Sequence, residues 1–123
     1  MTKTECRKEL EKLESEANDI IRVAIQKVMP CSNTAMLAEL FKIIRLTAVL
    51  RSEISLILKD VWDNIMNEVA ILNKIAKEAK VMSNLYWKLS VAIKNRDPKL
   101  ITELSKEIEN LRIKIEDSLV INL

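Results

Sequence analysis

The chain contains no glycine, and its 123 residues include only two prolines. Strands and tight turns rely on glycine wherever the backbone must take a positive φ, and many helices end on it. A chain without glycine therefore has few tight turns, and long helices must take up most of its length. This feature predicts an all-α protein. Any left-handed helix cap should fall on asparagine, with Asn33 and Asn95 best placed.

Residues 8–30 carry the clearest helical pattern in the chain. Apolar residues recur every three or four positions, so one side of the helix is apolar and the opposite side is charged. Thr2 and Glu5 form a capping box, which predicts that the helix begins near residue 4. Pro30 lacks a backbone N–H and should end the helix at about residue 29. The apolar positions are Leu10, Leu13, Ala17, Ile20, Ile21, Ala24 and Val28.

Residues 34–95 continue the apolar periodicity without proline or glycine. Asn33 and its neighbours are good N-caps, so a second helix should begin at residue 34. A single helix over the whole stretch would be ~90 Å long, too long for a compact domain. We therefore expect a break near residues 58–63, with Asp60 capping the next helix, and Ser83-Asn84 is the second candidate position. One bent helix is the alternative.

Asp97 and Pro98 mark a stop and a restart, because aspartate is a good N-cap and proline is favoured at the first helical position. The last helix carries a heptad-like apolar seam, and Arg112 is spaced to pair with Glu109 and Glu116. The sequence predicts a single domain over residues 1–123, an up-down four-helix bundle with long antiparallel helices. The expected helices span about 4–29, 34–58, 61–95 and 98–121.

The composition restricts the environment and the chemistry. Hydrophobic residues make up 49% and charged residues 31%, with a net charge of +2, which is typical of a solvated surface and makes nucleic-acid binding an unlikely role. No apolar run approaches the ~18–20 residues of a membrane span, and the start lacks a signal-peptide core, so we expect a cytoplasmic protein. Cys6 and Cys31 should lie ~37 Å apart along one helix, too far to bond within a chain. They are expected to be free thiols, with an intermolecular disulfide in an antiparallel dimer as the alternative.

The sequence contains few of the residue combinations that enzymes use for catalysis. The chain has no histidine, which removes histidine bases and the usual zinc sites, and no glycine, which removes phosphate-cradling loops. We therefore expect neither an enzyme nor a cofactor. Asp60, Asp63 and Glu68 are weak candidates for a metal site, since carboxylates at helical spacing can share an ion. The simpler interpretation is that these acids favour a helix N-terminus.

Two sets of residues are candidates for binding a partner. Lys74, Lys77 and Lys80 lie at helical spacing and could contact phosphates, or could simply form a solvated face. Trp62 is expected in the core. Tyr86 and Trp87 are adjacent and therefore ~100° apart around a helix, so one of them should lie at an edge where a protein partner binds.

The first helix has a similar counterpart near the other end of the chain. Residues 8–13, KELEKL, align without a gap on residues 106–111, KEIENL, and Asp19 then aligns with Asp117. Either these are two ordinary coiled-coil-type helices or the chain contains an internal duplication.

With both copies in view, the chain resembles a short, divergent member of the PhoU family, which includes the accessory proteins of Pit-type phosphate transporters. Residues 9–18, ELEKLESEAN, and the distance to Pro30 are similar to the second helix of that family's three-helix unit. Residues 80–111 resemble its first helix, its turn and the start of its second helix. The residues that carry this second match are Ala92, Arg96, Asp97, Leu100 and Ile101.

The resemblance implies a regulatory or accessory role in phosphate uptake. It also implies protein partners, such as a membrane transporter or its regulator, and self-association. It does not extend to the family's metal clusters, because Asn18 replaces an acid and residues 42–53 lack the E-x-x-x-D motif. A coiled-coil structural or adaptor subunit, self-associating through residues 98–121, is the alternative. A nucleic-acid accessory subunit would need Lys74–Lys88 to converge with Arg45 and Arg51.

Overall fold

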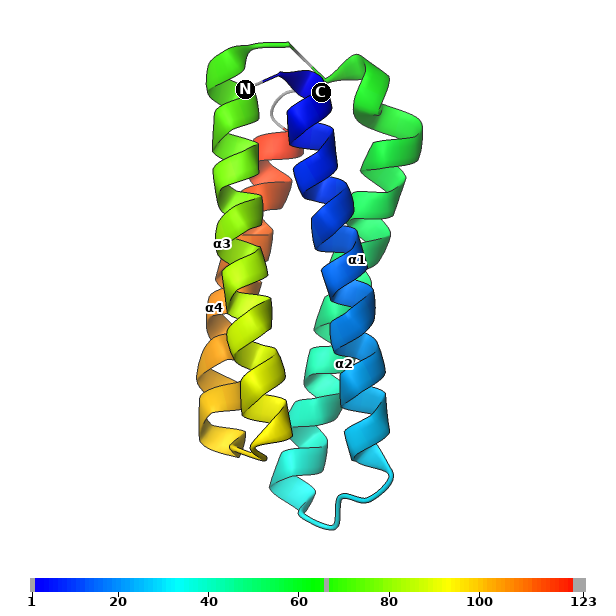
Figure 1. Cartoon of the computed structure of the whole chain (residues 1–123), viewed down its shortest axis with the longest axis vertical. Coiled ribbons are helices and arrows are strands. Elements are labelled where there is room, and N and C mark those ends of the chain that lie inside the picture. The colour runs from blue at the N-terminus through cyan, green and yellow to red at the C-terminus, as the bar shows by residue number, and fades with distance from the viewer. Residues whose placement is uncertain (1, 66, 121–123) are drawn as a thin grey trace.

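The computed structural model describes residues 2–65 and 67–120, and this part of the chain is all-α with no strand (Figure 1). Its four long helices alternate in direction along the bundle axis, which confirms the predicted helical bundle. Apart from the start of the third helix, the helix boundaries lie within two residues of the predicted positions; the predicted last residue, 121, lies outside the described residues. The helices are α1 (Lys3–Val28), α2 (Thr34–Leu56), α3 (Val69–Lys94) and α4 (Pro98–Val120).

The predicted caps account for three of the helix starts. The Thr2 hydroxyl accepts a hydrogen bond from the backbone N–H of Glu5 at 3.1 Å. The Asn33 side chain accepts one from the N–H of Met36, also at 3.1 Å. The Asp97 carboxylate accepts one from the N–H of Leu100 at 3.2 Å. Each bond satisfies a backbone donor that the first turn of a helix leaves free.

The second helix does not break at residues 58–63, so the predicted start of the third helix at residue 61 is wrong. Helical structure continues through a π-helical turn, Ile57–Val61, and a 3₁₀ turn, Trp62–Asn64. Asp60 lies exposed inside the π-helical turn, and the N-cap of α3 is Glu68. No proline or glycine interrupts this stretch, and the burial of Leu58, Trp62 and Ile65 holds it against the bundle.

Residues 57–65 lie in a crossover connection at the end of the bundle where α1 begins (Figure 1). Trp62 is buried, as predicted, and two cations of α1 lie over its ring, with Lys3 Nζ at 5.7 Å and the Arg7 guanidinium carbon at 5.8 Å from the ring centre. Lys3 also donates to the carbonyl of Ile65 at 2.8 Å, and Arg7 to that of Leu58 at 3.1 Å. Cation–π contacts and these hydrogen bonds therefore fasten the crossover to the first turns of α1.

The four helices form a ring in the order α2, α1, α3, α4. Extensive packing joins α1 to α2, α1 to α3 and α3 to α4, whereas α2 and α4 close the ring with much sparser packing. Over the described residues, no Cα atoms of the diagonal pairs, α1 with α4 or α2 with α3, approach within 8 Å. The fold is thus two helical hairpins side by side. The two helices aligned in the sequence, α1 and α4, occupy opposite corners and run in opposite directions.

One core runs the length of the bundle. The predicted stripe of α1 is buried at Leu10, Leu13, Ala17, Ile20 and Ala24, and α4 buries Ile101, Leu104, Ile108 and Ile115. The left-handed backbone position falls at Arg96, with φ of 52°, and on neither predicted asparagine. Asn33 has an extended backbone because it is the N-cap of α2. Asn95 has a right-handed backbone, and the backbone N–H groups of Arg96 and Asp97 donate hydrogen bonds back into the last turn of α3.

Candidate functional site

The outward side of α2 exposes large apolar side chains. Phe41 is 57% exposed, Val49 41% and Leu56 56%. With Arg45 and Ser52 they follow the spacing 4, 4, 3, 4 and so lie on one stripe of the helix. We call these five residues the α2 outer face. Its only charged member is Arg45, whereas the exposed side of α1 is densely charged.

A groove of about 600 Å³ lies between α2 and α4, where the packing of the bundle is sparsest. Two turns of each helix line it, and Arg45 and Val49 belong both to the groove and to the α2 outer face. The two features are therefore one continuous surface. Lining residues are Lys42, Arg45, Leu46 and Val49 from α2, and Ser105, Lys106, Glu109, Asn110 and Arg112 from α4.

The groove carries an excess of positive charge. Among the described residues, Lys42, Arg45 and Lys106 form no ion pair. The only acid in the lining, Glu109, is bound by Arg112. Arg45 and Lys106 thus have no ion-pair partner among the described residues, and Lys42 has only the electrostatic attraction of Glu109. These cations surround a floor that includes Leu46 and Val49. This surface suits a ligand that is both apolar and acidic.

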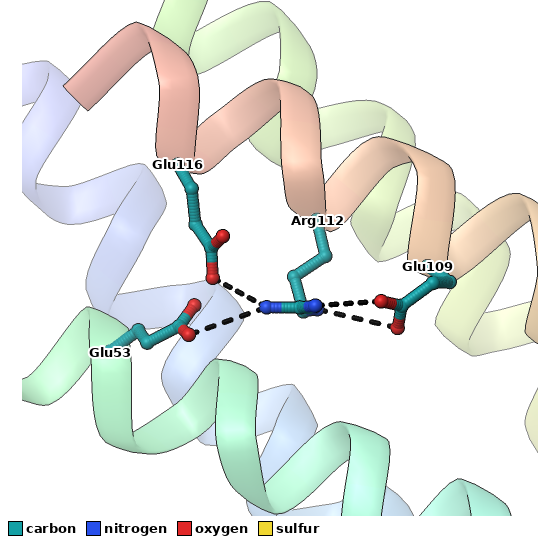
Figure 2. A network of polar contacts seen from close by, with 4 residues as sticks. All are labelled: Glu53, Glu109, Arg112 and Glu116. Carbon is teal, nitrogen blue, oxygen red and sulfur yellow. Dashed lines mark hydrogen bonds and ion pairs between the residues drawn. The ribbon is translucent and has the colours of Figure 1, made fainter. Parts of the chain in front are cut away.

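Beside the groove, Arg112 joins three carboxylates and forms a polar link between α4 and α2 (Figure 2). Its guanidinium binds both oxygens of Glu109, at 2.6 and 3.3 Å, and one oxygen of Glu116 on the same helix. It also reaches Glu53 of α2 at 3.3 Å. The predicted pairs with Glu109 and Glu116 are confirmed, and the contact with Glu53 is an addition from the fold.

The three carboxylates differ in their affinity for protons. Burial raises the pKa of Glu53 to about 7, helped by a hydrogen bond and by repulsion from Glu116, and opposed by Arg112. The hydrogen bond from Arg112 instead lowers the pKa of Glu109. Glu53 therefore takes up a proton close to neutral pH, so the link between α2 and α4 depends on pH.

The three metal candidates are spread along the crossover. Asp60, Asp63 and Glu68 are all exposed, and the backbone carbonyl of Asp63 accepts a hydrogen bond from Lys3. Residues 2–65 and 67–120 contain no group of three or more Cys, Asp or Glu side chains placed to hold a metal ion. These acids therefore form no ligand set in this part of the chain.

The structure separates the basic residues. Lys77 and Lys80 lie with Asn73 and Asn84 along a shallow groove of α3, whereas Lys74 lies beside Glu78 toward α4. Arg45 belongs to α2, at the opposite corner of the ring from α3.

Arg51 is also occupied elsewhere, because it donates to Asn18 across the seam between α1 and α2 at 3.0 Å. The convergence of Lys74–Lys88 with Arg45 and Arg51 that a nucleic-acid subunit would need is therefore absent.

The adjacent aromatic residues lie on different sides of α3, as predicted. Trp87 is 68% exposed, close to Lys80 and to Glu16 of α1. Tyr86 is 1% exposed and lies in the core with its hydroxyl beside Thr47. The prediction that Tyr86 contacts a partner is therefore corrected, because its position in the helix points it into the core.

The α2 outer face and the groove were not predicted. A signal was present, because the apolar residues of α2 are only weakly segregated to one side, so that apolar side chains also fall on its exposed side. Its fully exposed residues include no acid, and Glu39 and Glu53 are half-buried. The sparse packing of α2 against α4 had no such signal, since it depends on the order of helices around the ring.

Within the described residues, none of the helices combines the length and apolar character needed to cross a bilayer. Comparisons with protein-family models, with curated proteins and with solved structures found no match for this chain.

Proposed function

We propose that this protein is a helical adaptor that binds another protein through the α2 outer face, and that this binding regulates phosphate uptake. The observation that carries the binding role is the stripe of Phe41, Val49 and Leu56 on the exposed side of α2. Burying the exposed parts of these three side chains would contribute about 3 kcal/mol, taking half of the usual value for full burial. Exposed apolar side chains aligned on one stripe of a helix are typical of a surface that receives another helix.

The phosphate-uptake role is supported by the resemblance to the PhoU family, through residues 9–18 with Pro30 and through the turn at Arg96–Leu100. It implies a cytoplasmic protein whose partner is a membrane transporter or a regulator of one. The proposal does not include the metal clusters of the family, because Asn18 accepts a hydrogen bond from Arg51 at a position where an acid would be required. Residues 42–53 also lack the acidic pair.

Self-association, which the resemblance also implies, would use a surface other than the α2 outer face. Two copies facing each other there would bring the cations Lys42 and Arg45 of both into one interface, and no fully exposed residue of α2 is acidic to pair with them. Trp87 is the best-placed alternative, since it is 68% exposed on the far side of the bundle and has a polar, charged rim.

The alternative role as a coiled-coil subunit has less support. It predicted association through the apolar seam of residues 98–121. That seam packs inside the bundle, with Ile101, Leu104, Ile108 and Ile115 all buried. A structural subunit would therefore also have to use the α2 outer face, without any link to phosphate.

Photo-crosslinking in cells tests the proposal. A photoreactive amino acid at Val49 should crosslink a transporter or its regulator, whereas one at Val81 should not. Val81 is a matched control because it is 45% exposed on α3, compared with 41% for Val49. Deletion of the gene should change the rate of phosphate uptake, and the Val49→Asp variant should fail to restore it. Normal uptake in the deletion strain, or equal crosslinking from both positions, would contradict the proposal.

A further inference from the structure

We infer that the α2 outer face and the adjoining α2–α4 groove bind an acidic amphipathic helix of the partner protein. This inference rests on the proposed function and specifies the chemistry of the partner. Three features carry it: the shape of the groove, the sign of its charges and the length of the apolar stripe.

The shape of the groove indicates a helix. Its α2 wall uses residues 42, 45, 46 and 49, and its α4 wall uses residues 105, 106, 109, 110 and 112, so two turns of each helix face the same space. α2 and α4 run in the same direction (Figure 1). A trough between two helices receives a third helix whose anchors are spaced three or four residues apart, which is a common mode of peptide recognition.

The positive charges of the groove indicate that the bound helix is acidic. Lys42 and Arg45 stand on one wall and Lys106 on the other, and none of them has an ion-pair partner among the described residues. No fully exposed residue of α2 is acidic. A basic helix would be repelled, and a second copy docking through the same face would add further cations to the interface without an exposed acid of α2 to pair with them. Carboxylates flanking an apolar stripe would pair with all three cations.

The stripe sets the size of the bound segment. From Phe41 to Leu56 the α2 outer face extends about 22 Å at the usual helical rise, which matches four turns of a helix, or about 15 residues. The apolar anchors would lie over Phe41, Val49 and Leu56. The acidic residues would be placed toward the Phe41 end of the segment, opposite Arg45 and Lys106.

Two labelled peptides of about 16 residues would test the inference by fluorescence anisotropy. Both carry the same leucine stripe, and their flanking positions are all glutamate in one and all lysine in the other. The glutamate peptide should bind the full chain at least about 10-fold more tightly than the lysine peptide, and salt should weaken its binding. In the double variant Lys42→Glu, Arg45→Glu the preference should reverse.

Matched variants locate the binding. Val49→Asp should weaken the glutamate peptide by about 10-fold or more, whereas Val81→Asp should have little effect. The double variant Lys77→Glu, Lys80→Glu removes the same number of positive charges from α3 and should leave the preference for glutamate intact. Circular dichroism of each variant confirms that the bundle remains folded.

Three results would overturn the inference. One is equal affinity for the two peptides, and another is binding that Val49→Asp does not change. The third is a dimer in light scattering that Val49→Asp converts to a monomer, which would make a second copy the occupant. These outcomes are distinct from failure of the proposed function. If the crosslink from Val49 maps to a non-acidic segment of a transporter, the function holds and the inference is wrong.

Discussion

Replacing Glu53 by glutamine should make the protein more stable at alkaline pH. Burial and the nearby Glu116 raise the pKa of Glu53 from 4.5 to about 7, so the folded state holds this proton more tightly than the unfolded chain does. The stability that comes from this proton is fully present below pH ~4.5 and is lost as the pH rises through about 7. Glutamine keeps the shape of the side chain and removes the cost of its charge.

The magnitude follows from the shift. A change from 4.5 to about 7 corresponds at most to ~3.4 kcal/mol. The Glu53 side chain is 34% exposed, and screening by water reduces this ceiling. We expect the wild type to lose about 1–2 kcal/mol of unfolding free energy between pH 5 and pH 8, an order-of-magnitude figure from the same linkage. The Glu53→Gln variant should lose less and be about 1 kcal/mol more stable than the wild type at the alkaline end.

Urea unfolding followed by circular dichroism at a series of pH values measures both quantities. Burial also raises the pKa of Glu78, so Glu78→Gln is the control for a carboxyl outside the Arg112 network. The pKa shift of Glu109 has the opposite sign to that of Glu53. Because the pKa of Glu109 is lowered, its charged form contributes stability that is lost only at more acidic pH. A Glu53→Gln variant that is less stable than the wild type at alkaline pH, or that keeps the same slope, would refute the argument.

Three further predictions concern the rest of the bundle. Acrylamide should quench the fluorescence of Trp87 strongly and that of Trp62 weakly. The Trp87→Phe variant should therefore show only the blue-shifted, weakly quenched emission of Trp62, and equal quenching of the two tryptophans would contradict their placement. Tyr86→Phe combined with Thr47→Val should change stability little or raise it by about 1 kcal/mol, because neither buried hydroxyl has a well-formed hydrogen bond among the described residues; a loss above ~2 kcal/mol in urea unfolding would show that the two oxygens do bond. Arg96→Gly should stabilise the protein by up to ~1 kcal/mol in thermal unfolding, because glycine adopts the φ of 52° without strain, and a lower melting temperature would refute this.

Features that depend on local chemistry were predictable from the sequence. The lack of glycine, the apolar periodicity and the N-caps Thr2, Asn33 and Asp97 act over one or two turns, and the structure agrees with each of them. The pairing of Arg112 on its own helix follows from spacing along the chain. Each of these features could be predicted because its partners are neighbours in sequence.

Features that depend on contacts between distant residues were not predictable. The third helix starts later in the chain than predicted because Trp62, in the connection before it, is held by Lys3 and Arg7, about 60 residues earlier in the chain. The left-handed backbone conformation falls on Arg96 because the N–H groups of Arg96 and Asp97 bond to carbonyls in the last turn of α3. The contact between Arg112 and Glu53 and the groove beside it exist only because α2 and α4 are neighbours in the ring. No local pattern encodes that order.

The diagonal crossover makes the protein divisible. Residues 57–65 are fastened to α1, so a cut between the crossover and α3 would leave one fragment with α1, α2 and the whole Trp62 cluster, and another with α3 and α4. Each fragment would be a complete hairpin with one uncovered apolar side. The extensive α1–α3 contact would provide most of the surface that brings the two halves back together. The same chain could therefore be reconstituted from two separately produced pieces.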